Sequence, residues 1–557
     1  MRPTFYGLEI ARKGLHVSQA NLEVTAHNIA NANTEGYTRQ QVVQKAVEPN
    51  VGMGLFAYGG YAVVGGVDIQ QVRQIRDAYL DIQYRKEVLS LGEWEVKRDI
   101  LSYIEAIFNE PSDSGINTVL NEFFNALQAL SLNPEDPTTR ATVQQKALAL
   151  TENIRNVYTK LEELQREANQ AIISYVSDIN AYAQEIAALN EQIYKFEITG
   201  KPANDLRDQR NLLVDKLAKI VQVSVYEDAN GRFRVDIAGQ TLVYHTKAYL
   251  LDTVKRSSSV EDGKYPKNNY IDVDDLVEVV WKDTGEKVNI TGGILKGYID
   301  MRDGIGGKEQ PLPGVPEELS GTTPTAGQFK PAPNQNTEYG IPYYMRMWNL
   351  FAHTLMITFN EIHSQGYALV VDEETGGLRT GIDFFSDGSG SYDPTDLSRP
   401  IAKYITISDD IRNDWNNIAA IYLDKNDIDD LSKYFGEDVD ESVLATYAKG
   451  NNKNILRLLE LRYKTYVPEC DNMDNFTKAL ISTLGVASRQ AAHMADNQEM
   501  LVNEMDKRRQ SVSGVSLDEE MANMVRFQHA YNASARILTA IDEMLDVLIN
   551  RMGVVGR

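Results

Sequence analysis

The sequence predicts an α+β multidomain protein in which helical ends enclose a β-containing middle. Toward both ends of the chain, small or apolar residues recur at alternating steps of three and four, the spacing of one face of a helix. From residue 221 onward, apolar and polar residues alternate instead, which is typical of half-buried strands. The expected fold class therefore combines terminal α-helical coiled-coil-like segments and a helical-bundle domain with an inserted β-containing outer region.

The two terminal segments are heptad-like seams with unusually small or polar members. The first seam, within residues 4–34, consists of Leu8, Ala11, Leu15, Ser18, Leu22, Thr25 and Ile29. The second consists of Leu517, Met521, Met524, Gln528, Tyr531, Ala535, Leu538, Leu545, Ile549 and Met552. Burying a full aliphatic side chain contributes about 1.5–3 kcal/mol, and Ser or Ala contribute much less. We therefore expect terminal helices that are marginal alone and become ordered when subunits assemble.

The stretch "NIANANTEGYTRQ", residues 28–40, ends the first helix in a run of amides. Asn is poor in a helix interior because its side chain competes for backbone hydrogen bonds. We expect Asn28, Asn31 and Asn33 to cap and bridge this helix end, and Gly36 to let the chain leave the helix. The side chains expected to contact either the next subunit or the next domain are Tyr37, Thr38 and Arg39.

Longer helices are expected inward of the seams. The turn-rich string "NEPSDSG" separates two of them, and Pro134 and Pro137 precede a long run with a heptad-like apolar stripe. The expected helices cover residues 86–109, 116–132, 139–198, 204–220, 342–364 and 475–512.

The middle of the chain is expected to contain strands and loops. Alternating residues on both sides of Asn230 and Gly231 predict a β-hairpin, and further strands are expected at residues 248–253 and 277–290. Residues 308–337 are rich in Pro, Gly and Thr and are interpreted as a long surface loop. Residues 365–450 are acidic and mixed, with short strands such as "KYITIS".

A net charge of −23 over 557 residues describes a strongly acidic protein. This charge argues against nucleic acid, whose binding depends on basic residues, and against anionic membrane surfaces. No stretch approaches the ~20 apolar residues of a membrane span. Cys470 is the single cysteine, so an intramolecular disulfide is excluded. Charged residues interrupt the N-terminus, so it lacks the apolar core of a secretory signal, and any export takes another route.

The sequence shows no pattern for a catalytic, metal or cofactor site. The seven histidines are scattered, and no HExxH motif occurs. The string "DKNDIDD", residues 424–430, lacks the Gly and Glu that an EF-hand loop requires, so we interpret it as an acidic, solvated turn. The glycine-rich residues 51–66 lack the Lys and Ser/Thr of a phosphate-binding loop and are interpreted as a connector. We expect no cofactor and no enzymatic activity.

Both ends of the chain resemble the rod, hook and hook-associated proteins of the bacterial flagellum. The resemblance rests on "SQANLEVTAHNIANANTEGYTRQ" and "GGVDIQQVRQIRDAYLDIQYR" near the N-terminus, and on "SGVSLDEEMANMVRFQHAYNASARILTAIDEMLDVLIN" near the C-terminus. The string "NTEGYTRQ" and the box Asp518-Glu519-Glu520 are closest to the hook-associated members at the first hook–filament junction. The resemblance is clear over residues 1–220 and 470–557 and loose over 221–364, whereas residues 365–450 are interpreted as lineage-specific.

The resemblance implies a structural subunit that leaves the cell unfolded through the flagellar type III export apparatus, without a cleaved signal peptide. Its implied place is outside the cell, at the junction of hook and filament. The implied partners are the hook protein, the second junction protein (hook-associated protein 3), further copies of the chain in a helical ring, and an export chaperone at the C-terminal helix. Neither nucleic acid nor a membrane is an implied partner.

The resemblance also divides the chain into three parts. They are a terminal helical core (1–50 with 513–557), a helical domain (51–220 with 342–364 and 470–512), and an inserted outer region (221–341 with 365–469). The residues expected to pack subunits together are Leu8, Leu15, Leu22, Asn28, Asn31, Gly36, Tyr37, Arg39, Leu517, Met521, Met524, Tyr531, Leu538 and Leu545. The alternatives are another axial subunit of the rod or hook class, and a flagellar subunit with an enzymatic outer insertion.

Overall fold

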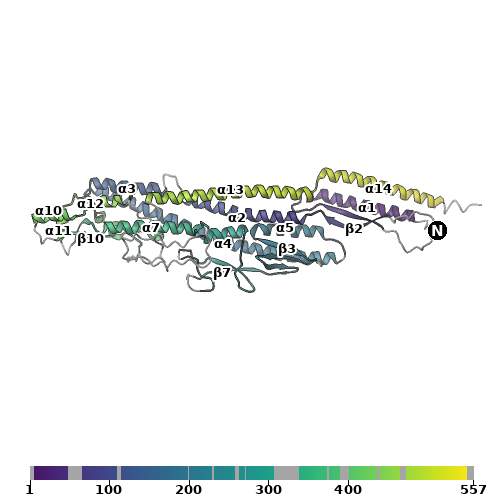
Figure 1. The fold of residues 1–557 in the computed structure, drawn as a ribbon, viewed down its shortest axis with the longest axis horizontal. Helices are drawn as coiled ribbons and strands as arrows, with labels where there is room; N and C mark the ends of the chain where they lie inside the picture. The colour runs from purple at the N-terminus through teal and green to yellow at the C-terminus, as the bar shows by residue number, and fades with distance from the viewer. Residues whose placement is uncertain are drawn as a thin grey trace, which may run out of the picture.

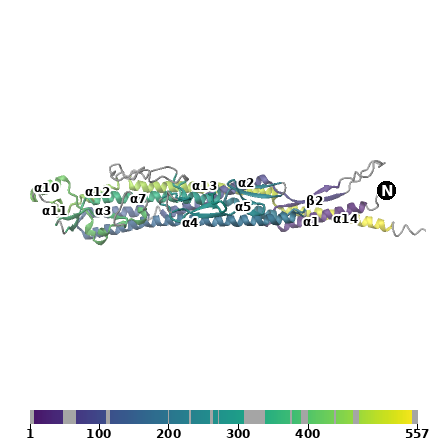
Figure 2. The same cartoon turned by 90° about the horizontal axis from the view of Figure 1, so that it is seen from below.

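The first and last helices of the chain lie side by side at one end of a long rod (Figure 1). The structure is a computed structural model, and it describes residues 6–47, 66–108, 115–198, 200–228, 231–257, 263–269, 271–306, 338–372, 376–388, 400–435, 440–463 and 472–547. At the far end of the rod lie the short helices α10 (Lys425–Phe435) and α11 (Glu441–Ala445). A view turned by 90° shows the same extended shape (Figure 2).

The end of the rod that carries the termini is built from two helices and a β-ribbon. Helix α1 (Tyr6–Ala30) packs along α14 (Leu517–Asp546), so the two terminal seams do pair. Strands β1 (Gln40–Ala46) and β2 (Val67–Gln74) form an antiparallel ribbon beside α1. Most of the expected connector at 51–66 lies outside the described residues.

The middle of the rod is a bundle of long helices, close to the expected ranges. They are α2 (Ala78–Phe108), α3 (Ile116–Leu132), α4 (Pro137–Glu197), α5 (Asn204–Ile220), α7 (Ile341–His363) and α13 (Met473–Ser513). Helix α4 begins where the sequence provides a start signal, because Asp136 accepts a hydrogen bond from Thr138 N and Pro137 occupies the first turn. Aromatic residues of α7 fill the core beside it, and Trp348 Nε1 donates to Ile154 O at 2.9 Å.

The inserted β-structure rests on the second half of α4. Strands β3 (Val223–Glu227), β4 (Phe233–Ile237), β5 (Gln240–Tyr244) and β6 (Lys247–Ala248) form an antiparallel sheet, and β7 (Leu251–Lys255) pairs with β8 (Val277–Trp281). The hairpin expected around residue 230 is therefore present. Buried residues of the sheet, such as Val235 and Leu242, share a core cluster with Ile172 and Ile179 of α4. Helix α6 (Gly293–Asp303), which the sequence did not predict, follows β8 and also packs on α4.

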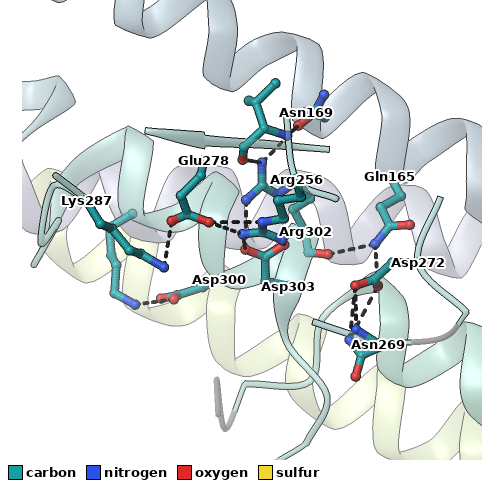
Figure 3. A network of polar contacts seen from close by, with 12 residues as sticks. Gln165, Asn169, Arg256, Asn269, Asp272, Glu278, Lys287, Asp300, Arg302 and Asp303 are labelled. Atoms are coloured by element: carbon teal, nitrogen blue, oxygen red, sulfur yellow. Dashed lines mark hydrogen bonds and ion pairs between the residues drawn. The ribbon is translucent and has the colours of Figure 1, made fainter. Parts of the chain in front are cut away.

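A buried polar network joins the insertion to α4 (Figure 3). Asp303 at the end of α6 accepts hydrogen bonds from Nη1 and Nη2 of Arg256 at 3.0 and 2.7 Å, and from Arg302 at 2.8 Å. Arg302 Nη1 in turn donates to Asn169 Oδ1 of α4 at 2.9 Å. Nearby, Gln165 Nε2 donates to Asp272 at 3.0 Å. The insertion is thereby held to the helical spine by hydrogen-bonded side chains as well as by apolar contacts.

Toward the far end, short elements close over α7 and the start of α4. They are β9 (Tyr367–Val371), β10 (Leu378–Thr380), β11 (Phe385–Ser386), α8 (Ile401–Tyr404), β12 (Thr406–Ile407), α9 (Asp409–Asn413), the 3-10 turn η3 (Trp415–Asn417) and α12 (Lys453–Glu460). In the expected strand "KYITIS", only Thr406 and Ile407 are in a strand, and the first two residues end helix α8. The long loop expected at 308–337 and the single cysteine, Cys470, lie outside the described residues.

The acidic string at residues 424–430 is the start of helix α10, so its interpretation as a turn was wrong. Asp424 Oδ1 accepts hydrogen bonds from Asn426 N and Asp427 N, both at 3.0 Å, and so caps the helix. The ammonium group of Lys453 lies between the two carboxylates, 2.7 Å from Asp424 and 2.5 Å from Asp427. The acidic residues therefore start a helix and pair with a lysine.

Candidate functional site

The amide of Asn28 is the centre of a joint between the terminal helices and the body of the rod. Asn28 lies in the last turn of α1 and is 1% exposed. Its Nδ2 donates to Gln40 O at 2.9 Å and to Glu520 Oε2 at 3.1 Å. Its Oδ1 accepts from Tyr37 OH at 2.8 Å and from Gln40 N at 3.0 Å. One side chain thus connects α1, the start of β1 and the first turn of α14.

Arg39 binds the acidic first turn of α14. Its guanidinium donates to Glu520 Oε1, with Nε at 2.9 Å and Nη2 at 2.7 Å, and to Glu519 Oε2 at 3.0 Å. The Glu520 side chain is 3% exposed and that of Glu519 is 64% exposed, so the two pairs differ in burial. The backbone N–H of Arg39 donates to Ser513 O at 2.9 Å, at the end of α13. Arg39 therefore holds the connection between α13 and α14 as well as α14 itself.

Thr38 joins the same segment to α5. Its backbone N–H donates to Asp208 Oδ2 at 2.9 Å, and its hydroxyl donates to Asp208 Oδ1 at 2.6 Å. Burial raises the pKa of Asp208 to about 6, although the two bonds from Thr38 and the charge of Arg76 act in the opposite direction. The guanidinium of Arg76 lies 3.7 Å from the carboxylate. Gln40, the first residue of β1, donates to Asp205 of α5 at 2.7 Å.

The turn before Thr38 is compact and contains the predicted glycine. Helix α1 ends at Ala30, and Asn31 Nδ2 donates to His27 O at 3.0 Å, which satisfies a carbonyl in the last turn. Gly36 lies six residues beyond the helix end, not directly at it, and has a positive φ of 78°. A Cβ built on Gly36 would come within 3.1 Å of Leu212, so both backbone conformation and space favour glycine. Asn33 is exposed in this turn.

Tyr37 lies at the end of α1, close to the carboxylates of Asp205 and Asp208 in α5. Its hydroxyl lies 2.9 Å from His27 Nδ1 and donates to Asn28. Burial raises the pKa of Tyr37 well above its ordinary value, and the nearby carboxylates of Asp205, Asp208 and Glu520 act in the same direction. Tyr37 is therefore a neutral hydrogen-bonding residue that helps to hold Asn28.

Further ion pairs continue from this joint into the body. Asp215 of α5 accepts from Arg85 of α2 and from Arg509 of α13, both at 2.6 Å. The Arg509 guanidinium also lies over the ring of Tyr84, 3.9 Å from its centroid. A cleft of about 910 Å³ is lined by Tyr84, Asp215, Arg509 and Arg39, among others. Among the residues that the structure describes, no group of acidic, histidine or cysteine side chains could hold a metal ion.

The seam leucines of α1 are not its most buried residues. Ala11, Ser18, Asn21 and Thr25 of α1 are buried, whereas its three leucines are only half-buried. The half-buried seam residues are Leu8, Leu15, Leu22, Ile29, Met524, Tyr531, Ala535, Leu538 and Leu545, whereas Gln528 is exposed. Leu517 and Met521 are 48% and 60% exposed, so the two helices leave them uncovered. The role of these residues in subunit packing stays a prediction.

The structure thus brings together Asn28, Tyr37 and Arg39 of the sequence prediction and adds partners that the sequence did not indicate. Thr38 meets α5, in the expected helical domain of the same chain, and the next domain was one of the two partners expected. Arg39 instead binds Ser513, Glu519 and Glu520, which lie in the same expected terminal core as Arg39 itself. Glu520 could be found only as part of an acidic first turn, where acidic residues are common at any helix start. Asp208 lies within the helical string "NDLRDQR" and carries no signal that separates it from a solvated carboxylate.

No helix in the described part of the chain is long and apolar enough to cross a lipid bilayer.

Three family models match the sequence. Residues 101–385 match the flagellar hook-associated protein FlgK helical domain. Residues 8–38 match the flagella basal body rod protein model, and residues 508–552 match the C-terminal model of the flagellar basal body rod FlgEFG proteins.

Curated relatives match the chain from end to end. Flagellar hook-associated protein 1 of Bacillus subtilis (strain 168) is 34% identical, with 100% of both chains covered. The protein of the same name from Salmonella typhimurium is 28% identical over 97% of this chain and 98% of its own. The solved structure of the flagellar hook junction protein FlgK from Burkholderia pseudomallei has the same fold, with a TM-score of 0.52 at 15% identity, and covers 78% of this chain and 100% of its own. This chain therefore belongs to the flagellar hook-associated protein 1 family.

Proposed function

We propose that this chain is a structural adaptor that joins the flagellar hook to the filament. The observation that supports this most directly is the joint around Asn28 and Arg39. It holds a pair of terminal helices to a helical body through hydrogen bonds, while the helices leave apolar side chains uncovered for other subunits. The α1–α14 pair is firmly attached to the body but only partly buried, which suits a protein whose terminal helices pack against other subunits.

The half-buried seams favour further copies of the chain as the first partners. Leu517 and Met521 lie exposed on α14, and Leu8, Leu15 and Leu22 are only half-covered by it. Apolar side chains left in this way gain burial when another helix packs on them. We propose that the pair of α1 and α14 forms the inner core of a ring of subunits. The helical domain surrounds that core, and the β-containing insertion lies outward.

The remaining partners follow from the family resemblance. We propose contact with the hook protein on one side and with hook-associated protein 3 on the other, and capture of the C-terminal helix by an export chaperone before secretion. The location is the outside of the cell, reached through type III export without a cleaved signal peptide. We also propose that the chain has no enzymatic activity.

Another axial subunit of the rod or hook class is the second candidate, because the two terminal family models are rod-type models. The match of residues 101–385 to a hook-associated helical domain, together with relatives that cover the whole chain, favours the junction protein. The two candidates predict different defects. Loss of a rod or hook subunit stops growth before the hook is complete, whereas loss of a junction protein leaves complete hooks.

Electron microscopy of a strain that lacks this gene tests the proposal. We expect complete hooks without filaments, with flagellin released into the medium. Returning the intact gene should restore filaments, whereas variants without residues 1–40 or 515–557 should not. Normal filaments in the deletion strain, or restored filaments with either truncation, would contradict the junction role.

A further inference from the structure

The α1–α14 pair is antiparallel, and its contacts repeat at heptad intervals. A Cβ built on Gly7 would lie 3.3 Å from Ile541 Cδ1, and one built on Gly14 would lie 3.1 Å from Ser534 Oγ. One heptad forward along α1 therefore corresponds to one heptad back along α14. Two heptads further on, Asn28 binds Glu520, in the same register. The two glycines let the helices approach closely at these positions.

Most of this contact does little to select that register. Two buried polar residues of α1 bond to their own helix: Ser18 Oγ donates to Gly14 O at 2.8 Å, and Asn21 Nδ2 donates to Val17 O at 2.7 Å. The half-buried residues of α14 repeat with the heptad period, as Met524, Tyr531, Leu538 and Leu545. A helix pair with a strict heptad repeat and small residues on one side offers a similar contact after a shift by one heptad.

The contact between Asn28 and Glu520 is different, because it is specific and buried. All four hydrogen-bonding positions of the Asn28 amide are used, and Arg39 fixes the Glu520 carboxylate. A shift by one heptad would place Phe527 opposite Asn28 and leave the buried amide without this partner. A buried amide at one seam position is a known way of fixing the register of paired helices.

The connections at the joint favour one direction of shift. Residues 514–516 between α13 and α14 are already extended, with ψ values of 158° at Gly514 and 112° at Ser516. The segment after α1 is folded into successive turns, with Thr34 N bonded to Asn31 O and Tyr37 N bonded to Thr34 O. It can therefore lengthen, which lets α1 move away from the body and brings Gly14 opposite Ile541.

We propose that Asn28 and Glu520, held by Arg39, set the register of the α1–α14 pair, and that the pair moves by one heptad when this contact is lost. The joint then has two roles. It attaches the terminal helices to the body, and it determines how far α1 extends beyond the body. This inference concerns the single chain and goes beyond the proposed junction role.

Disulfide trapping in the full-length chain tests the inference, in a Cys470→Ser background that contains no other cysteine. The pair Gly14→Cys with Ser534→Cys reports the observed register. A Cβ built on Gly14 would lie 3.9 Å from Ser534 Cβ, within the range that a disulfide requires. The pair Gly14→Cys with Ile541→Cys reports the shifted register. Each pair is combined with Asn28→Ala, Glu520→Ala or the matched control Glu519→Ala, which removes a carboxylate that binds Arg39 but not Asn28.

The readout is the disulfide-linked fraction of the monomer after mild oxidation, with the linkage assigned by peptide mass spectrometry. With the joint intact or with Glu519→Ala, we expect the 14–534 pair to link and the 14–541 pair to remain mostly reduced. With Asn28→Ala or Glu520→Ala, we expect 14–541 linkage to rise at least fivefold and 14–534 linkage to fall.

Two outcomes would overturn the inference. One is unchanged linkage of both pairs in Asn28→Ala and Glu520→Ala, which would mean that the seams alone select the register. The other is loss of both linkages together with lower helical ellipticity, which would mean that the contact holds the helices folded and offers no second register. Because the measurement uses the monomer, it is independent of whether the chain acts at the hook–filament junction.

Discussion

Asn28 uses every hydrogen-bonding position of its side chain inside the joint. Two donors and two acceptor positions are satisfied by Gln40, Tyr37 and Glu520. No other side chain of similar size offers donors and acceptors in this arrangement, because leucine has neither and aspartate has only acceptors when ionised. An amide that is unfavourable for a helix interior is therefore well suited to the last turn of this one.

Asn28→Ala should loosen the end of α1. The change removes an acceptor from Gln40 N and from Tyr37 OH in a part-buried place, at a cost of about 1–3 kcal/mol. Hydrogen exchange measured by mass spectrometry should show faster exchange in residues 20–47 and little change in α4. Asn33→Ala, in the exposed turn, is the matched control and should exchange like the parent chain. Equal exchange in both variants would show that the amide network does not stabilise the joint.

His363 makes the far end of the rod sensitive to acid. It is fully buried, its Nδ1 lies 2.7 Å from Ile382 O, and its Nε2 accepts from Ala419 N at 2.9 Å. Burial lowers its pKa from 6.5 to about 4, and the charge of Arg140 acts in the same direction. The folded state thus binds its proton less readily than the unfolded chain. The stability that this histidine contributes is complete above pH 6.5 and is lost as the pH falls from 6.5 to 4.

The expected difference between pH 7.5 and pH 4.5 is up to roughly 3 kcal/mol from this residue. His363→Gln, which can still donate and accept but does not titrate, should show a smaller loss of stability over the same range. Urea denaturation of the full chain at several pH values measures this difference. His529→Gln on the exposed side of α14 is the control and should keep the parent pH dependence. A parent-like slope for His363→Gln would exclude His363 as its source.

At the scale of elements, the long helices were easier to predict than the short ones. Helix α13 was expected at 475–512 and spans Met473–Ser513, since an apolar stripe sustained over many turns leaves little choice of period. Helix α10 has only a few apolar positions, Ile428 and Leu431 among them, and these pack in a small cluster near β9. Such a short pattern cannot be distinguished from a turn until its tertiary contacts are known.

Leu538→Asp should separate α14 from α1. Leu538 is half-buried and lies between Ser534 and Ile541, which approach Gly14 and Gly7 of α1, so helical spacing places it on the same face. A carboxylate there removes apolar contact and partly buries a charge, at a cost on the order of 2 kcal/mol. Limited proteolysis of the monomer should then cut α14 earlier than in the parent chain. Ile537→Asp is the control, because Ile537 is 54% exposed and should be cut at the parent rate. Similar cutting of both variants would contradict the assignment of the contact face.

At the scale of the whole molecule, the rod depends on how the insertion is held to α4. Burial alone would raise the pKa of Asp303, but Arg302 and Arg256 outweigh it and hold that pKa well below its usual range. Each of these three side chains is buried, so each needs the others to offset the loss of water. The network in Figure 3 is therefore a single unit that couples β7, β8 and α6 to the spine.

Asp303→Asn should release the insertion without melting the terminal pair. Two buried guanidinium groups would lose their shared carboxylate, which costs about 3–5 kcal/mol for a buried pair. Pulse proteolysis in urea should show residues 251–303 becoming cleavable at a lower urea concentration, whereas α14 is unaffected. Asp275→Asn makes the same change at a carboxylate that is 71% exposed and pairs with Lys255, so it should shift the midpoint little. A small shift in both variants would mean that apolar packing alone holds the insertion.

The sequence predicted one half of the joint but not the other. Asn28, Gly36, Tyr37 and Arg39 were expected there because amides, a glycine and a sudden polar triplet follow a helical repeat. Asp208 and Glu520 were not, because a carboxylate on a helix looks the same in sequence whether it is solvated or buried. Asp208 is 5% exposed and Glu520 is 2% exposed, because segments far away in the chain cover them.

The sequence by itself determined the helical ends, the long helix α4, the hairpin after residue 221 and the family. Each of these follows from local periodicity or from contiguous motifs. Only the tertiary structure decided that the small residues of α1, and not its leucines, form the close contact with α14. It also decided that Asn28 meets Glu520, and that two arginines share Asp303. The contacts of α1 with α14 pair segments hundreds of residues apart, and Arg256 reaches Asp303 across 47 residues. The energies of such pairings come from contacts that a local sequence pattern does not contain.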